Sequence, residues 1–206
     1  MSQLKRVRRI YDADPAGYHR SMSSGLTARM LAGRREKVGE AVEGRVLDIG
    51  FGSGLSLPHY PAGVEVFAVD YSLAMLRHAA VKADRGVQLV QADAEQLPFP
   101  DRSFDSVAFN LCLCTIPDPA QAIREGLRVA RPGAPMIFLE HVRSHLPPIA
   151  LLQDLINPIC VVWQADHFNR RTAEVVRASG VEIERVDRWF GGVFNLIYGR
   201  APADRP

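Results

Sequence analysis

The chain is short of cysteine, of net charge and of long apolar runs, and each shortage disfavours a class of protein. Three cysteines in 206 residues fit a reduced, cytoplasmic protein better than a disulfide framework. A formal net charge of +2 indicates no particular partner. The N-terminus is charged and has no apolar segment, so it does not read as a secretory signal. We therefore expect a soluble cytoplasmic protein.

Membrane and nucleic-acid roles are constrained in the same way. The most apolar stretch, Ile149 to Trp163, is too short to span a bilayer and contains Asp154 and Pro158. The first 35 residues carry eight Lys or Arg against two acids, which fits either a solvated helix face or peripheral contact with an anionic membrane. We expect no nucleic-acid partner, because the Asn/Asp-Pro-Pro-aromatic tetrad used on flipped adenines does not follow the predicted fourth strand. The sequence favours no oligomeric state.

What the sequence does contain is a regular alternation of strand and helix patterns. Its 47 % apolar and 23 % charged residues suit a single globular domain over residues 1–206. From residue 45 onward, β-rich runs alternate with helical ones, as in a parallel sheet covered by helices. The predicted strands are 45–49, 64–69, 87–91, 106–109 and 135–139, and the predicted helices are 72–82 and 118–129.

The two ends of the chain depart from this alternation. Residues 1–43 precede the first strand and are expected to form an N-terminal helical cap, helical in its second half. Residues 142–171 form a substrate-side insertion whose apolar middle has helical spacing interrupted at Pro158. The C-terminal elements are a helix over 172–179 and two strands, 181–189 and 194–198, around a Gly191-Gly192 turn. Such a hairpin predicts an antiparallel pair at the edge of the sheet.

The central motif follows the first predicted strand directly and reads Asp48-Ile49-Gly50-Phe51-Gly52-Ser53-Gly54. Glycines let the backbone turn sharply and approach a ligand closely. A dinucleotide fingerprint needs glycine at position 55, where the chain has Leu55, and a pyrophosphate would avoid the nearby Asp48. These features disfavour a nicotinamide oxidoreductase and favour a cationic ligand that carries an amine and a sulfonium.

Polar residues also end the next three predicted strands. Asp70 is placed to accept hydrogen bonds from both hydroxyls of an adenosine ribose. Asp93, followed by Ala94, is placed to meet the adenine amino group, and Asn110 and Leu111 would line the same crevice. Because the carboxyl ends of parallel strands share one edge of the sheet, these residues predict a nucleoside site there.

The chain resembles the class I S-adenosylmethionine-dependent methyltransferases in the stretches VLDIGFGSG, VFAVDYS, QADAEQLPFPDRSFDSV and LRVARPGAPMIFLEH. The resemblance implies a Rossmann-like, doubly wound α/β fold with seven strands in the order 3-2-1-4-5-7-6, strand seven being antiparallel. It also implies S-adenosyl-L-methionine as cofactor and S-adenosyl-L-homocysteine as product. The cofactor residues that it implies are Asp48, Gly50, Gly52, Gly54, Asp70, Asp93 and Ala94, with Tyr71 and Met75 beside the ribose and adenine.

Within this family the chain is similar to the ubiquinone and menaquinone methyltransferase-like branch and to two of its relatives. The runs GSGLSLPHYP and YDADPAGYHR resemble soluble bacterial phosphatidylethanolamine N-methyltransferases. LEHVRS followed by LLQDLINPICVVWQADHFNRRT resembles membrane-associated thiol methyltransferases. The acceptor implied is small and hydrophobic: a thiol, a quinol or phenol, or a lipid amine. A non-catalytic nucleoside-binding module is the alternative of another class, and it is disfavoured because no cofactor position is visibly damaged.

Methyl transfer requires donor and acceptor to be held in line, and it needs a base only where the acceptor must lose a proton. The candidate bases are His141, just after the fifth strand, and Asp166 with His167 in the insertion. Tyr11 and Tyr18 could close over the sulfonium, because aromatic faces attract onium groups. For the two histidines and the two tyrosines, ordinary packing is the alternative interpretation.

The cysteines offer little sign of a metal site. Cys112 and Cys114 form a Cys-x-Cys pair whose side chains would share one strand face, but no second pair exists. Buried thiols near the cofactor are the ordinary interpretation of such residues. We therefore expect no bound metal.

Overall fold

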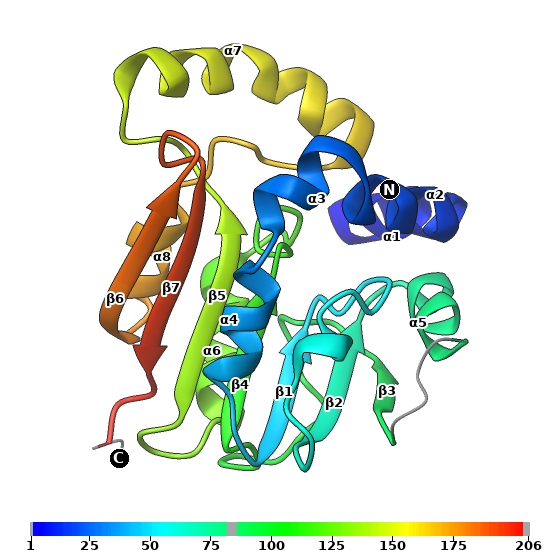
Figure 1. The fold of residues 1–206 in the computed structure, drawn as a ribbon, viewed down its shortest axis with the longest axis vertical. Helices are drawn as coiled ribbons and strands as arrows, with labels where there is room; N and C mark the ends of the chain where they lie inside the picture. Colours follow the sequence, from blue (N-terminus) through cyan, green and yellow to red (C-terminus); the bar gives the residue numbers. More distant parts are fainter. Residues whose placement is uncertain (1, 82–85, 204–206) are drawn as a thin grey trace.

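The computed structural model describes residues 2–81 and 86–203, and its strands form a seven-stranded sheet (Figure 1). Their order is β3-β2-β1-β4-β5-β7-β6, as predicted, and β7 runs antiparallel to both of its neighbours. The strands are β1 (Arg45–Ile49), β2 (Glu65–Asp70), β3 (Gln88–Gln91), β4 (Ser106–Asn110), β5 (Pro135–His141), β6 (Glu182–Trp189) and β7 (Phe194–Arg200). Every predicted strand is confirmed, with ends that differ by at most two residues.

Helices cover both faces of the sheet. Successive side chains of a strand point to opposite faces, and the central strands carry apolar side chains on both. In β1, Leu47 and Ile49 belong to the cluster packed by α6 and α8, whereas Val46 belongs to the cluster packed by α4 and α5. The helices are α1 (Gln3–Ala13), α2 (Pro15–Ser23), α3 (Gly25–Leu31), α4 (Arg34–Glu40), η1 (Leu57–His59), α5 (Leu73–Ala80), α6 (Pro119–Val129), α7 (Pro147–Gln164) and α8 (Thr172–Ala178). The doubly wound α/β architecture is therefore confirmed.

The N-terminal helices lie beyond the carboxyl ends of the central strands, with α7 above β5, β6 and β7 (Figure 1). The prediction that only the second half of residues 1–43 is helical is wrong, because α1 already begins at Gln3. Ser2 caps this helix by accepting a hydrogen bond from the Lys5 amide, and Asp14 caps α2 by accepting from the Gly17 amide at 2.7 Å. These helices cover the edge of the sheet where the predicted site lies.

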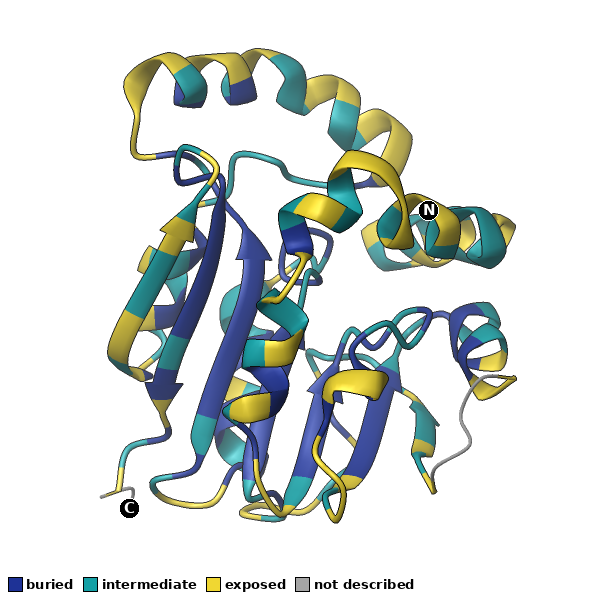
Figure 2. Cartoon of the chain, viewed as in Figure 1, coloured by how far each residue is buried: buried dark blue, intermediate teal, exposed yellow. Residues whose placement is uncertain are grey.

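The insertion consists mainly of one long helix. The predicted interruption at Pro158 does not occur: α7 runs through this residue, which leaves the carbonyl four residues earlier without an amide donor from the proline. Gln153 fixes the helix, since its amide donates to the carbonyls of Val142 (2.8 Å) and Phe168 (2.9 Å). Most of the remaining helix is exposed (Figure 2). No helix within the described residues is long and apolar enough to cross a membrane.

Two smaller predictions concern helix ends and the C-terminal hairpin. The helix predicted to reach Lys82 is described to Ala80, and Lys82 lies outside the described residues. Its predicted cap is confirmed, because the Ser72 hydroxyl accepts from the Met75 amide at 3.1 Å. In the hairpin, β6 is the edge strand and β7 pairs with β5.

Candidate active site

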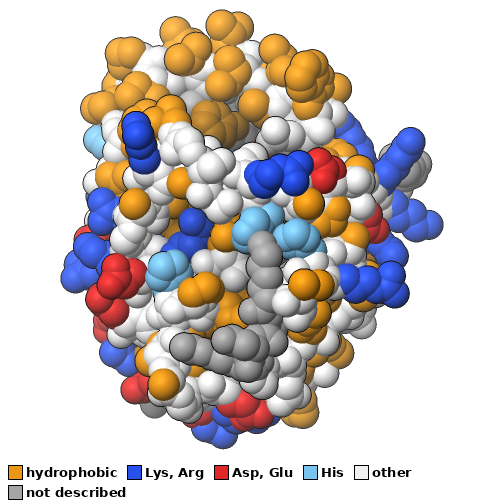
Figure 3. Space-filling model, turned by 45° about the vertical axis from the view of Figure 1, so that its right-hand side comes forward, with side chains coloured by type: hydrophobic (Ala, Val, Ile, Leu, Met, Phe, Trp, Pro, Cys, Tyr) orange, Lys and Arg blue, Asp and Glu red, His pale blue; other side chains and the backbone are white. Residues whose placement is uncertain are grey.

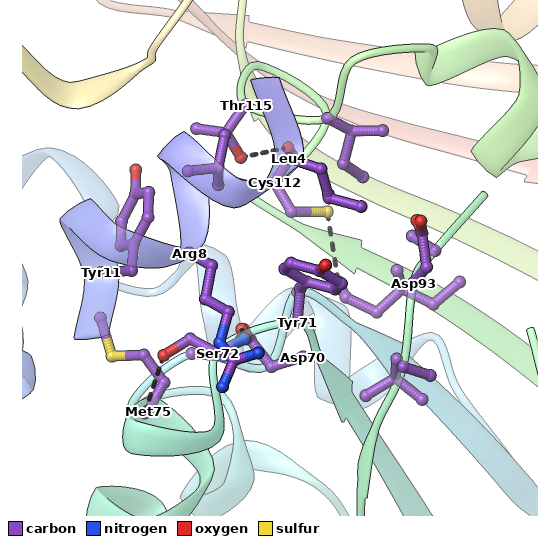
Figure 4. Close-up of a pocket in the computed structure, with 18 of the residues that line it drawn as sticks. Leu4, Arg8, Tyr11, Asp70, Tyr71, Ser72, Met75, Asp93, Cys112 and Thr115 are labelled. Atoms are coloured by element: carbon purple, nitrogen blue, oxygen red, sulfur yellow. Dashed lines mark hydrogen bonds between the residues drawn. The ribbon is translucent and has the colours of Figure 1, made fainter. Parts of the chain in front are cut away.

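A pocket lies where the carboxyl ends of β1 to β4 meet α1 and α2 (Figure 4). Its empty space, counted out to the open mouth, is about 730 Å³. Ten of the thirteen predicted cofactor residues line it: Tyr11, Tyr18, Gly50, Gly52, Asp70, Tyr71, Met75, Asp93, Ala94 and Leu111. The sheet topology thus brings together side chains from four strand ends, as the sequence predicted.

Asp70 is the carboxylate best placed at the pocket wall. Its two oxygens accept hydrogen bonds from the backbone amides of Gly52 and Ser72, both at 2.8 Å. Burial raises the pKa of Asp70 to about 6, although these amide hydrogen bonds oppose the shift. The Tyr71 amide also interacts with this carboxylate. A carboxylate has about four acceptor positions, so at least one remains for a hydroxyl group of a ligand.

The glycine turn supplies open space and close packing at different positions. At Gly52 the backbone φ is +57°, and an added Cβ would extend towards Tyr18, whose nearest ring carbon is 3.8 Å away. At Gly50 an added Cβ would lie 2.2 Å from the Cβ of Cys112. Gly52 therefore keeps the pocket open, whereas Gly50 allows the turn after β4 to approach the turn after β1.

The strand end after β3 adds a second carboxylate. Asp93 accepts a hydrogen bond from the Glu95 amide at 2.9 Å through one oxygen, and its other oxygen makes no hydrogen bond to a described residue. Ala94 follows it in the wall, and Met75, which is 1 % exposed, closes the pocket from α5. An acceptor group and apolar surfaces are the chemistry that an adenine ring requires.

The first helix forms a wall of which the sequence analysis predicted only Tyr11. Leu4, Val7, Arg8 and Tyr11 of α1 all line the pocket. Their spacing of three, one and three residues is that of one helix face, so the periodicity of residues 3–13 could have revealed them. Other lining residues not predicted are Ile49, Val69, Ser72, Ala92, Cys112, Thr115 and Ile116.

Tyr11 and Tyr18 lie together at one end of the pocket. Their rings meet edge to face with centroids 5.5 Å apart. Burial, followed by the charges of Cys114 and other neighbours, raises the pKa of both phenols above the ordinary value, so both stay neutral. The charges of Asp70 and Asp166 both contribute to these raised pKa values. The two phenols therefore lie between the nucleoside pocket, which contains Asp70, and the residues around Asp166.

Three predicted cofactor residues do not line the pocket, and their roles towards the cofactor remain predictions. Asp48 is 0 % exposed; it accepts hydrogen bonds from the Tyr60 hydroxyl and from the Asn110 amide, each at 2.8 Å. Burial raises the pKa of Asp48 to about 7. A Cβ added to Gly54 would lie 3.2 Å from the Cβ of Ala79, so Gly54 packs against α5 and does not face the pocket. Asp48 and Asn110 thus join the ends of β1 and β4 and position the turn without touching the space for a ligand.

The predicted bases His141 and Asp166 form a buried pair. The His141 Nε2 lies 3.2 Å from an Asp166 oxygen, and the Cys114 thiol hydrogen-bonds to the same carboxyl group. Burial lowers the pKa of His141, but the hydrogen bond and charge of Asp166 outweigh it and the net pKa is raised. Burial likewise raises the pKa of Asp166, but the contact with His141 outweighs it and the net pKa is lowered. The contact therefore makes His141 more basic than a free histidine and favours the ionised form of Asp166.

The third predicted base, His167, lies outside this pair. Its backbone amide donates to the Cys114 carbonyl at 3.0 Å, and its ring lies 3.5 Å from the Gln3 side chain. Burial, followed by the charge of Arg170, lowers the pKa of His167. Its ring is thus attached to α1, and it acts on Asp166 through its charge.

The cysteine geometry differs from that predicted. Cys112 and Cys114 share no strand face, because β4 ends at Asn110 and both residues lie in the turn that follows. Cys114 instead lies with His141 and Asp166, whose potential ligand atoms all fall within 4.8 Å of one another. A metal ion could use this spacing. His141 Nε2 and the Cys114 thiol both contact Asp166, whereas His141 Nδ1 and Asp166 Oδ1 have no hydrogen-bond partner among the described residues. The expectation of no metal remains a prediction.

Comparison with known proteins identifies the family of this chain. Residues 47–138 match the methyltransferase domain family. A phosphatidylethanolamine N-methyltransferase of Cereibacter sphaeroides is 32 % identical over 161 residues, which cover 75 % of this chain and 78 % of that protein. The chain belongs to the class I S-adenosylmethionine-dependent methyltransferases.

Other similar proteins agree with this membership. A demethylmenaquinone methyltransferase of Renibacterium salmoninarum is 36 % identical over 58 % of this chain, and the match spans 50 % of that protein's length. Among solved structures, a methyltransferase bound to the Haloferax volcanii activator Trm112 has a TM-score of 0.75 at 19 % identity, covering 93 % of this chain and 97 % of that one. A methyltransferase of Thermotoga maritima has a TM-score of 0.73 at 21 % identity, covering 95 % and 99 %. These two structures support the fold.

The pocket of this methyltransferase fits the cofactor of its family, S-adenosylmethionine. Asp70 retains at least one acceptor position for the ribose hydroxyls, and the open side of Gly52 leaves room for a ligand close to the backbone. Asp93 retains an oxygen for the adenine amino group. The neutral rings of Tyr11 and Tyr18 offer aromatic surface for a sulfonium. The residues present therefore suit this cofactor.

Proposed function

We propose that this methyltransferase methylates a small amphiphilic acceptor taken from a membrane surface, with His141 accepting the acceptor's proton. The observation that carries the proposal is the exposed apolar face of α7. Large apolar side chains on this helix that are exposed to between 57 % and 75 % are Leu151, Leu152, Leu155, Ile159, Val162 and Trp163. Figure 3 shows hydrophobic side chains gathered at this end of the molecule.

Such a surface is unusual for a helix that merely covers a core. A helix with one apolar face and basic flanks is typical of segments that lie in a membrane interface. Only Asp154 is charged on α7, and its carboxylate is paired with Arg143 at 2.8 Å. The apolar face therefore carries no unpaired acid that would repel an anionic bilayer.

Basic residues flank the C-terminal end of this face. Arg6 of α1 donates to the carbonyls of Val161 (2.8 Å) and Val162 (2.6 Å), so α1 is joined to the last turns of α7. The same helix carries Lys5 and Arg9. This connection places the basic arm predicted from the sequence next to the apolar face, which favours contact with anionic lipid over a merely solvated role.

The same two helices border the route to the cofactor. Leu4, Val7 and Tyr11 of α1 line the pocket, and Asp166 directly follows α7. An acceptor that arrives along α7 would therefore reach the His141–Asp166 pair before the cofactor pocket. Its apolar part would contact α7 and α1, and its reacting atom would enter beside the phenols of Tyr11 and Tyr18.

Proton removal is assigned to His141. The bound cofactor supplies an electrophilic methyl group on a sulfonium sulfur. His141 uses Nε2 to contact Asp166, and its Nδ1 is buried without a hydrogen-bond partner among the described residues. Nδ1 is then the atom that takes the proton, and Asp166 stabilises the imidazolium that forms. The structure of the pair suits acceptors with a removable proton: thiols, quinols, phenols and lipid ammonium groups.

Phosphatidylethanolamine is the second, more specific candidate for the acceptor. It is favoured by the similarity to the Cereibacter sphaeroides enzyme, because the matched region covers 78 % of that enzyme's length. An ammonium group must lose its proton before it attacks the methyl group, so the same base is required. In this case the lipid would remain in the bilayer while its headgroup enters the site.

The test is methyl transfer from labelled cofactor to thiols, quinols, phenols and phosphatidylethanolamine, each in vesicles and as a water-soluble analogue. A Leu151→Ser/Leu155→Ser variant removes two exposed apolar side chains from α7, and Val81→Ser, which is 87 % exposed in wild type, is the matched control. We expect KM for the vesicle-borne acceptor to rise about tenfold per leucine. The rate with the soluble analogue should not change. Equal loss with both acceptor forms would contradict the membrane route, and no transfer to any acceptor would contradict the proposed function.

A further inference from the structure

A second cleft, distinct from the cofactor pocket, lies beneath the N-terminal half of α7. It is bounded by residues 142–145, by α8 and by the hairpin of β6 and β7, and it shares no lining residue with the cofactor pocket. Its empty space, counted out to the open mouth, is about 1340 Å³. The proposed methyl transfer uses none of it.

The charge of this cleft is strongly positive. Four arginines line it, Arg143, Arg171, Arg177 and Arg188, whereas Glu174 is its single acidic lining residue. Arg143 is neutralised by Asp154 and Arg171 by Glu174. Arg177 and Arg188 form no ion pair with any residue that the structure describes. Two guanidinium groups thus remain available for an anion from solution.

The floor of the cleft contains buried polar groups that lack partners. Thr172 is 1 % exposed and Asn195 is 3 % exposed, and both line the cleft. The Thr172 hydroxyl and the Asn195 side-chain oxygen have no hydrogen-bond partner within the described part of the chain. Burying such a group without a partner destabilises the fold, so these atoms point to a ligand.

Both groups can donate to an anion. A threonine hydroxyl can donate or accept, and rotation of the asparagine amide by half a turn exchanges its oxygen for an NH₂ group. Two hydrogen-bond donors at the floor and two guanidinium groups at the mouth match the oxygens of a phosphate, which accepts hydrogen bonds from several directions. A carboxylate ligand would use fewer of these donors.

We infer that this cleft binds a phosphate group, and that its source at a membrane is the headgroup phosphate of an anionic phospholipid. Leu151, which is 71 % exposed, belongs both to the wall of the cleft and to the apolar face of α7. A lipid phosphate in the cleft would therefore have its acyl chains beside that face. Phosphate binding itself is independent of the proposed function, whereas the lipid source rests on the proposed contact of α7 with a bilayer.

The first experiment follows backbone amide resonances during titration with inorganic phosphate. It compares the wild type with Arg177→Gln/Arg188→Gln and with the matched control Arg77→Gln, an exposed arginine on α5. We expect saturable shifts at Thr172 and Asn195 in the wild type and the control, and an affinity lower by about fivefold per arginine in the double variant. Cofactor affinity should be equal in all three proteins, which verifies that each is folded.

The second experiment measures cosedimentation with phosphatidylcholine vesicles that contain or lack phosphatidylglycerol. If the double variant loses binding to the anionic vesicles as well as to inorganic phosphate, the lipid is the source. If it loses phosphate binding only, the phosphate site stands and the lipid source is overturned. Equal phosphate affinity in the double variant and the wild type, or shifts that leave Thr172 and Asn195 unmoved, would overturn the site. These results do not depend on whether any acceptor is methylated.

Discussion

The role assigned to Asp70 can be tested by replacing its carboxylate with an amide of the same shape. In the wild type both oxygens accept backbone hydrogen bonds at 2.8 Å, from Gly52 and Ser72, and at least one acceptor position remains for the ribose hydroxyls. Asp70→Asn turns one oxygen into a donor. It therefore removes one backbone contact and at least one acceptor position for the ribose.

The magnitude follows from the value of a charge-assisted hydrogen bond. Losing one such bond costs about 1.5–3 kcal/mol, so we expect the Kd for S-adenosylmethionine to rise by roughly 10- to 100-fold in calorimetry. The matched control is Asp118→Asn at the N-cap of α6, where the Asp118 side chain accepts from the Gln121 amide. Asparagine caps a helix as well as aspartate does, so this variant should keep wild-type affinity and stability.

The pH dependence provides an independent readout of the same carboxylate. The pKa of Asp70 is raised to about 6, so its acceptor capacity is lost as the pH falls through that value. Cofactor affinity of the wild type should therefore fall in this window, and the Asp70→Asn variant should lack this part of the dependence. Wild-type affinity in a folded Asp70→Asn protein would refute the assignment of the ribose to this residue.

Three further predictions concern the base, the buried network and the glycine turn. Asp166→Asn removes the interaction that raises the pKa of His141, and burial, which lowers this pKa, remains. The acid limb of the kcat–pH profile should therefore move to lower pH. An unmoved limb would contradict the His141 assignment. Tyr60→Phe removes the hydrogen bond that the Tyr60 hydroxyl donates to Asp48. Because the pKa of Asp48 is raised to about 7 in the folded state, stability falls as the pH rises through that value and the buried carboxylate forms. The Tyr60 hydroxyl stabilises this carboxylate more than the neutral acid. Urea unfolding should therefore show a loss of about 1–3 kcal/mol above pH about 7 and a smaller loss below it. Gly52→Ala, at φ +57°, should lower stability and weaken cofactor binding at least about tenfold. The control Gly63→Ala, at φ +96° with nothing within 4 Å of an added Cβ, should lower stability alone. Equal cofactor binding by the two variants would exclude Gly52 from the cofactor wall.

The sequence alone determined the sheet and most of the nucleoside pocket. The alternation of strand and helix patterns along the chain predicts a parallel sheet. Because the carboxyl ends of parallel strands share one edge, Asp70 and Asp93 had to lie near the glycine turn. These residues are local to their strands, so their position depends on the chain direction and little else. The glycine hairpin near the C-terminus likewise predicted the antiparallel strand β7.

Only the tertiary structure decided which of the polar residues face a ligand. The motif predicts Asp48 as a cofactor contact, whereas in the structure its oxygens accept hydrogen bonds from Tyr60, in the loop that follows the motif, and from Asn110 at the end of β4. The pairing of His141 with Asp166 and the cleft around Thr172 also join residues far apart in sequence. Local patterns fix the backbone direction of each element, whereas the partner of a buried polar group depends on which segments the fold packs together.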